Sequence, residues 1–250
     1  MATLHIRHAI VLLGAITAVA AAPAAAAGNS SAGTPVTVRV EGKSKTLLAS
    51  TVVRLHSGSV TKDGAPKGAC STDSEAGALD AATHHRWAGK YYSEYHDYLI
   101  DSILGETYKA SANYYWEVFA DNVSAKGACE TAHPHRGEVF LFAAVPLADD
   151  AAYPLLITGA PTHAQAGKAF KVKVVYVNAK GKKVALGGAR LSGSDFAAVT
   201  TSANGTATIK PTKAGTLTLR ASHGATTAKV KGVPEKFGYV RAADVAVPVS

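Results

Sequence analysis

Apolar residues in this chain recur at every second position in short runs, and glycine-containing turns separate the runs. Val36, Val38 and Val40 alternate with polar residues near the start, and the run 170–177 repeats the pattern in the second half. A period of two is typical of a strand with one buried face, whereas a helix repeats every 3.6 residues. The chain is therefore expected to be rich in short strands.

One segment departs from this pattern. Thr72-Asp73-Ser74-Glu75 has the spacing of a capping box at a helix start, and apolar residues then recur at helical spacing from Ala76 to Ala82. Gly89 is placed to end this helix after Trp87. The order β-β-α-β-β-β predicts an α+β domain with one helix across a mixed sheet. Its strands are expected at 36–41, 46–60, 98–104, 114–120 and 138–145.

The second half carries many strand signals and little helix signal. Turns are indicated at 178–181, at Asn204-Gly205 and at 213–215, and Asn-Gly between two alternating runs predicts a type I′ hairpin. Short strands with regular turns favour an all-β sandwich. The strands are expected at 155–158, 170–177, 189–191, 198–201, 206–209 and 216–221.

Charge marks a boundary between the halves. Residues 34–150 hold 11 Lys and Arg against 15 Asp and Glu, a net charge of −4, whereas residues 151–250 hold 14 against 3, a net of +11. Such a reversal predicts separate domains. The basic half could contact a polyanion of the cell envelope, but its lysines are scattered as on solvated strands, and it could equally dock against the acidic half. No specific nucleic acid is expected. The predicted units are a first domain at 35–147, a linker at 148–153 and a second domain at 154–250.

The first 27 residues have the features of a secretory signal peptide. Arg7 precedes an apolar run, Ala9 to Ala22, and small residues lead to a cleavage site between Ala27 and Gly28. An uncleaved anchor is the alternative, but a spanning helix needs about 20 apolar residues and this run is shorter. No later stretch approaches that length. We therefore expect an extracellular, soluble chain that begins with a flexible segment at 28–34.

Two cysteines, Cys70 and Cys129, are the whole cysteine content. In an exported chain a lone pair usually forms a disulfide, the alternative being two buried free thiols. A bridge across about 60 residues stabilises the fold by about 4 kcal/mol.

Candidate binding residues come from an aromatic run and a histidine pair. Tyrosine and tryptophan are favoured where proteins bind partners or sugars, although core packing and pairs on a sheet face explain such residues equally. The histidines could bind a metal, but a site needs a third ligand, and a polar loop is the plainer interpretation. No metal or cofactor is expected. The candidate ligand-binding residues are Tyr92, Tyr95, Tyr115, Trp116, His133 and His135.

Catalytic patterns are missing from the sequence. No serine or cysteine stands in a glycine-flanked turn with suitable histidine and acidic partners, and no G-x-x-x-x-G-K-[ST] phosphate loop occurs. We expect no catalytic residues, and a hydrolase is the least favoured reading.

Several short motifs come in the order of one known family. They are Val38-Arg39-Val40-Glu41-Gly42, Gly77-Ala78-Leu79-Asp80, Ile103-Leu104-Gly105-Glu106, Tyr115-Trp116 and Gly127-Ala128-Cys129. Over about 36–145 the chain resembles the transcobalamin C-terminal-like domain, a β-grasp-type module of exported bacterial proteins. The chain departs from the family at Gly137-Glu138-Val139, which lacks a middle acid, and at Asp121-Asn122, which replaces an Asn-Gly turn.

That resemblance implies a β-grasp-like fold and a role in binding a small ligand or a protein. Corrinoid binding is a minor alternative, since the chain has no room for the helical barrel that completes the vertebrate carriers. In the second half, the runs 199–209 and 214–221 resemble bacterial Ig-like domains, which serve as spacers, stalks and occasional carbohydrate binders.

The sequence thus predicts a secreted, non-catalytic binding or surface protein. The β-grasp-like domain would recognise a small ligand, glycan or protein, and the basic Ig-like domain would act as a spacer or tether. The alternative is a purely structural or adhesive surface protein.

Overall fold

The computed structural model describes residues 33–109, 112–130 and 133–250. Among these residues the chain is mostly β-strand with one α-helix, as predicted. The predicted signal peptide and its cleavage site at Ala27 and Gly28 lie outside the described residues. Of the predicted flexible segment 28–34, Thr34 already belongs to the first strand.

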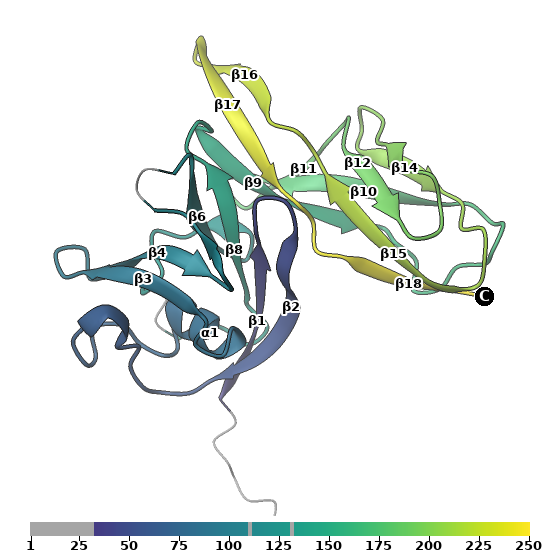
Figure 1. Cartoon of the computed structure of the whole chain (residues 1–250). Helices are drawn as coiled ribbons and strands as arrows, with labels where there is room; N and C mark the ends of the chain where they lie inside the picture. Colours follow the sequence, from purple (N-terminus) through teal and green to yellow (C-terminus); the bar gives the residue numbers. More distant parts are fainter. Residues whose placement is uncertain (1–32, 110–111, 131–132) are drawn as a thin grey trace, which may run out of the picture. The chain divides into compact units, whose positions relative to one another are not determined.

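A five-stranded mixed sheet forms the base of the first half (Figure 1). β1 pairs antiparallel with β2 and parallel with β8, so the first and last long strands of this half lie side by side at its centre. The strands follow the order β2 (Thr46–Leu55), β1 (Thr34–Glu41), β8 (Val139–Pro146), β6 (Tyr114–Ala120) and β7 (Val123–Ser124).

Helix α1 (Glu75–Ala82) packs against β1 and β2. The alternation seen in the sequence buries Val36, Val38 and Val40 completely, in one apolar core with Leu79 of the helix. Burial of one strand face under a single helix is what the sequence pattern predicted.

Both predicted ends of this helix are wrong. Its N-cap is Ser74, whose side chain accepts a hydrogen bond from the Gly77 N–H, while the Thr72 hydroxyl donates to a loop carbonyl instead. The helix stops at Ala82 because His84 and His85 both have positive φ, 51° and 63°, a conformation that no helix continues through.

Trp87 therefore begins a strand rather than ending the helix. A second, three-stranded sheet contains β3 (Trp87–Tyr92), β4 (Asp97–Ile103) and β5 (Glu106–Thr107) in that order. A short 3₁₀ turn, η1 (Lys62–Gly64), lies against β3.

The second half consists of two sheets that share one apolar core. Leu155 and Val174 from the larger sheet enter this core, as do Leu191 and Leu217 from the smaller one. The larger sheet has the order β11 (Lys183–Ala185), β10 (Phe170–Val177), β9 (Ala151–Thr158), β17 (Val233–Val240) and β16 (Thr226–Val230), and β14 (Thr206–Ile209) also pairs with β10. The smaller has the order β13 (Val199–Thr200), β12 (Arg190–Gly193), β15 (Gly215–Ser222) and β18 (Val245–Val249).

A tight turn forms at Asn204-Gly205, where the Ser202 N–H donates to the Thr206 carbonyl at 2.9 Å, but it is not the predicted type I′ turn. A type I′ turn requires positive φ at both central residues, but only Gly205 of this pair has it, at 79°. The Gly205 N–H donates to the Ser202 carbonyl, and the flanking strands β13 and β14 pair in different sheets. The turn therefore carries the chain from one sheet to the other.

The predicted linker at 148–153 is shorter in the structure, because β9 already begins at Ala151. Apolar side chains from the two halves also pack together, since Leu141 and Val145 of the first half cluster with Val240 of the second. Arg241 Nη2 lies 2.8 Å from the carboxylate of Glu41, which is 2% exposed. The described residues form one compact unit, and independent folding of two domains stays a prediction.

No helix in the described part of the chain has both the length and the hydropathy needed to cross a bilayer.

Candidate functional site

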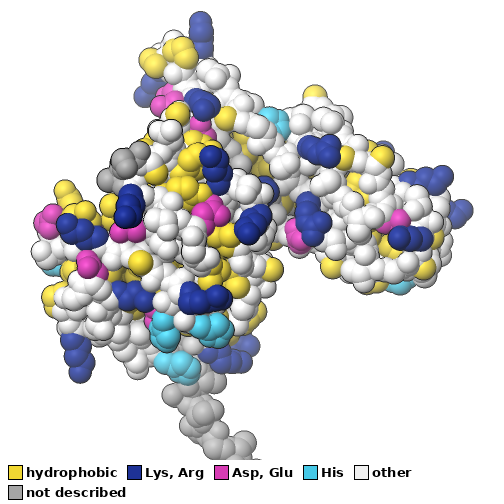
Figure 2. Space-filling model, viewed as in Figure 1, with side chains coloured by type: hydrophobic (Ala, Val, Ile, Leu, Met, Phe, Trp, Pro, Cys, Tyr) yellow, Lys and Arg dark blue, Asp and Glu magenta, His cyan; other side chains and the backbone are white. Residues whose placement is uncertain are grey.

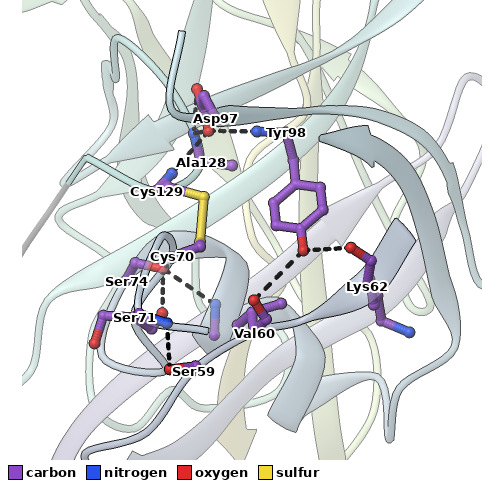
Figure 3. Close-up of a disulfide and its surroundings, with 12 residues drawn as sticks. Ser59, Val60, Lys62, Cys70, Ser71, Ser74, Asp97, Tyr98, Ala128 and Cys129 are labelled. Atoms are coloured by element: carbon purple, nitrogen blue, oxygen red, sulfur yellow. Dashed lines mark hydrogen bonds between the residues drawn. A yellow bond between two sulfur atoms is a disulfide. The ribbon is translucent and has the colours of Figure 1, made fainter. Parts of the chain in front are cut away.

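A disulfide joins Cys70 to Cys129, as predicted, with the two Cα atoms 5.2 Å apart (Figure 3). Cys70 lies shortly before the N-cap of α1, and Cys129 follows β7 in the loop that leads to β8. The bridge closes 59 residues and ties the helix start to that loop. By loop length alone it stabilises the fold by about 4 kcal/mol.

Asp97 holds the same loop from the other side. Its carboxylate accepts the backbone N–H groups of Tyr98 at 2.7 Å, Ala128 at 2.9 Å and Cys129 at 3.0 Å (Figure 3). A Cβ at Gly127 would overlap this carboxylate, so glycine is required for the close approach. Burial raises the pKa of Asp97 even though three donors favour the charged form.

Tyr98 anchors the start of β4 to the rest of the first half. Its hydroxyl donates to the Lys62 carbonyl at 2.8 Å (Figure 3). Its ring packs edge-on against Trp87 and Tyr91. Burial raises the pKa of Tyr98 to about 12, so the hydroxyl remains a donor at neutral pH. The Tyr98 side chain thus belongs to the framework that positions β4.

These anchors place β4 opposite β6 across a cleft of about 510 Å³, which we call the β4–β6 cleft. Its volume lies within the range of small-ligand sites. One wall is formed by consecutive residues of β4, from Asp97 to Ile100, and the other by Trp116 to Val118 of β6. The loop that carries Ala125 to Ala128 and Glu130 closes the space between them.

Three of the six predicted ligand-binding residues line this cleft, namely Tyr92, Tyr95 and Trp116. The rings of Tyr92 and Tyr95 are 6.3 Å apart, and Tyr95 is 75% exposed at the rim. Trp116 is only 5% exposed, and its indole N–H is buried with no acceptor among the described residues. A buried donor without a partner is unusual in a folded protein.

Tyr115 lies elsewhere. Successive side chains of a strand point to opposite faces, so the residue beside Trp116 cannot share its surroundings. Tyr115 packs instead with Phe119 and Leu141, and burial raises its pKa.

The two predicted histidines also lie outside the cleft and do not converge on each other. His133 Nδ1 contacts Asp73 at 3.1 Å, whereas His135 Nε2 contacts Asp121 at 2.7 Å. These separate hydrogen bonds disagree with a shared histidine site. Hydrogen bonding to Asp121 raises the pKa of His135.

A possible cation-binding group was not predicted from the sequence. Ligand atoms of Asp121, His135 and Glu138 all lie within 4.8 Å of one another, a donor set that a divalent ion accepts. Asp121 and Asn122 form the turn between β6 and β7 with φ of 47° and 67°, which brings this carboxylate back toward β8. In the structure the imidazole of His135 is already hydrogen bonded to Asp121.

No residue near Asp97 in the chain indicates its role, because the N–H donors at 128 and 129 lie some 30 residues away. Leu99 and Ile100 were expected only as strand residues, although both line the cleft.

No family model, no curated protein and no solved structure matches this chain.

Proposed function

We propose that this chain is an exported, non-catalytic binding protein and that the β4–β6 cleft is its recognition surface. The observation that carries the proposal is a cleft of about 510 Å³ with the rings of Tyr92 and Tyr95 at its rim and Trp116 in its wall. Aromatic side chains around a concave apolar surface, with a few polar groups to fix orientation, are the features of small-ligand sites. The disulfide and Asp97 hold one wall, so the site is largely formed in advance.

The strand order supports a β-grasp-like first domain. A β1–β2 hairpin is followed by a helix, and β8 then returns parallel to β1 at the centre of the sheet. This arrangement agrees with the resemblance to the transcobalamin C-terminal-like domain. Two sheets around one core likewise support an Ig-like second domain.

The basic second half is proposed as a spacer or a weak electrostatic tether to anionic cell-envelope polymers. On the face seen in Figure 2, Lys and Arg side chains are dispersed rather than gathered into one patch. Dispersed charge favours weak, salt-sensitive attraction over specific recognition.

A ligand-dependent thermal shift tests the proposed function. The panel contains vitamins including cobalamin, oligosaccharides and peptides, because a compound that binds only the folded state raises the melting temperature. The responding compound should lose its effect in Tyr95→Ala and keep it in Val52→Ala, a matched change at another exposed apolar residue outside the cleft.

A purely structural or adhesive role is the second candidate. Val230 and Val233 are exposed at the turn of the β16–β17 hairpin, and β16 is the edge strand of its sheet. If no compound of the panel stabilises the protein, and β16–β17 variants alone abolish attachment to cells, this role replaces the proposed one.

A further inference from the structure

A second group of polar side chains lies away from the cleft, where the turn between β6 and β7 meets the start of β8. Asp121, His135 and Glu138 come together there, with one ligand atom of each within 4.8 Å of the others. None of the three lines the β4–β6 cleft. Asp121 and His135 are 14 residues apart, so the chain must fold before they meet.

Backbone hydrogen bonds hold this group in place. The Asp121 N–H donates to the Val139 carbonyl at 2.8 Å, and the Val139 N–H donates back to Asp121 Oδ1 at 3.0 Å. In the same way the His135 N–H donates to Glu138 Oε2 at 2.9 Å, and the Glu138 N–H donates to the His135 carbonyl at 3.1 Å. The Thr37 N–H of β1 donates to the Glu138 carbonyl at 2.8 Å. The main chain thus positions all three residues without an ion.

The imidazole of His135 is oriented for coordination through Nε2. Its Nδ1 lies 3.3 Å from the Arg136 carbonyl, which can only accept a hydrogen bond, so Nδ1 carries a proton. Nε2 lies 2.7 Å from Asp121 Oδ2 and 3.9 Å from Glu138 Oε2. Histidines that bind metal ions through one ring nitrogen commonly donate the other N–H to a carbonyl or a carboxylate.

The local charge favours a cation between these side chains. Glu138 is buried, and no lysine or arginine in the described part of the chain forms an ion pair with either carboxylate. The imidazole of His135 is the group that faces both of them. A neutral imidazole with its proton on Nδ1 presents a lone pair to two anions, and a cation between the three groups stabilises that arrangement.

The donor set selects the class of ion. Imidazole nitrogen suits zinc and other first-row transition ions, whereas calcium and magnesium prefer oxygen ligands. Zinc binds its ligands at about 2.1 Å, so neighbouring donor atoms of a tetrahedral site lie about 3.4 Å apart. The contact from His135 to Asp121 is shorter than this and the contact to Glu138 is longer. His135 and Asp121 are exposed, so their side chains are free to adjust.

We propose that Asp121, His135 and Glu138 bind a divalent first-row transition-metal ion, and that zinc fits the site best. The ion replaces the hydrogen bond between His135 and Asp121 and joins the β6–β7 turn to the start of β8. Three protein donors leave one position of a tetrahedral ion for water. This inference goes beyond the proposed function and does not depend on a ligand in the cleft.

Zinc binding is measured by isothermal titration calorimetry on the exported protein, prepared without a histidine tag and freed of metal with a chelator. We expect a single zinc ion per chain, and calcium and magnesium should bind at least about tenfold more weakly. NMR of the imidazole nitrogens reports the coordinating atom. The Nε2 resonance of His135 should shift when zinc binds, while Nδ1 keeps its proton.

Variants locate the ion. His135→Ala changes an exposed side chain and should weaken zinc binding by about tenfold or more. His133→Ala is the matched control, because His133 is an exposed histidine of the same loop that contacts Asp73 instead, and this variant should bind zinc as the unchanged protein does. Glu138→Gln keeps the size of the buried side chain and should also weaken binding by about tenfold or more, with circular dichroism as the check on folding.

The inference is overturned if the protein binds no zinc, or if His135→Ala and His133→Ala bind zinc equally well, since the ion would then lie elsewhere. It is equally overturned if calcium binds as tightly as zinc and the Nε2 resonance of His135 does not shift. None of these results bears on the β4–β6 cleft, so the proposed function is decided separately by the thermal-shift panel.

Discussion

The carboxylate of Asp97 accepts the backbone N–H of Cys129 at 3.0 Å, so β4 is bonded directly to one end of the disulfide. Two elements that are 32 residues apart thus share one fixed point. The wall of the β4–β6 cleft and the loop that closes it are held together there.

Asp97→Ala should destabilise the protein by about 2 kcal/mol, because three backbone donors at Tyr98, Ala128 and Cys129 lose their acceptor. Urea unfolding measures the change. Glu94→Ala, which alters an exposed carboxylate of the preceding turn, is the control and should change stability by no more than about 0.5 kcal/mol. Equal effects of the two variants would contradict the anchoring role.

The pH dependence of stability should carry the signature of Asp97. Burial raises its folded pKa above the ordinary value of 3.8, so the folded state binds more protons than the unfolded state just above that pH. This group therefore makes the protein more stable as the pH falls through the folded pKa. We expect the unfolding free energy of the unchanged protein to rise relative to Asp97→Asn as the pH falls toward 3.8. If the difference in unfolding free energy between the two proteins stays constant or falls over this range, the result contradicts the burial of the Asp97 carboxylate.

Removing the disulfide should lower stability by about 4 kcal/mol, the value set by a closed loop of 59 residues. The double variant Cys70→Ser, Cys129→Ser is compared with the oxidised protein by chemical unfolding. The reduced protein serves as the control and should match the double variant. A loss below about 1 kcal/mol would show that other contacts already hold the loop.

Arg241→Met should destabilise the first half although the residue belongs to the second. It removes one partner of the buried Glu41 carboxylate, which keeps Arg39 at 2.9 Å, so we expect a loss of about 2 kcal/mol. Both tryptophans lie in the first half, so fluorescence reports that half alone, whereas circular dichroism reports both. Arg220→Met, at an exposed pair with Asp244, is the control. An unchanged fluorescence midpoint in Arg241→Met would favour two independent domains.

Local pattern predicted most strands of this chain, because one-sided burial leaves alternation in the sequence. The strands 114–120, 170–177 and 206–209 were predicted with their observed bounds. The β16–β17 hairpin was missed, because its exposed run 226–233 shows no alternation of buried and polar residues. At the turn of this hairpin, Lys231 and Gly232 both have positive φ, 51° and 86°. In the sequence, Gly232 is the only residue of the pair that indicates such a turn.

The helix was predicted too long for a similar reason. Apolar spacing continues to Trp87, but the backbone reverses at His84 and His85, where non-glycine residues adopt positive φ. Tertiary contacts support that reversal, since the Trp87 indole N–H donates to Asp80 at 2.7 Å. Sequence spacing contains no record of such a contact.

The candidate site was predicted only in part. Aromatic content pointed to Tyr92, Tyr95 and Trp116, which line the cleft, but it did not separate them from Tyr115 on the opposite face. The β4–β6 cleft depends on which strands become neighbours. That information lies in the pairing of distant segments rather than in any one run of residues.

The most direct test of the account is an NMR titration of the exported protein with the ligand recovered from the thermal-shift panel. The account predicts that shifts in amide resonances concentrate along 97–100, 116–118 and 125–130, the segments that line the β4–β6 cleft. Shifts confined to the second half, or a ligand that leaves the cleft unperturbed, would contradict it.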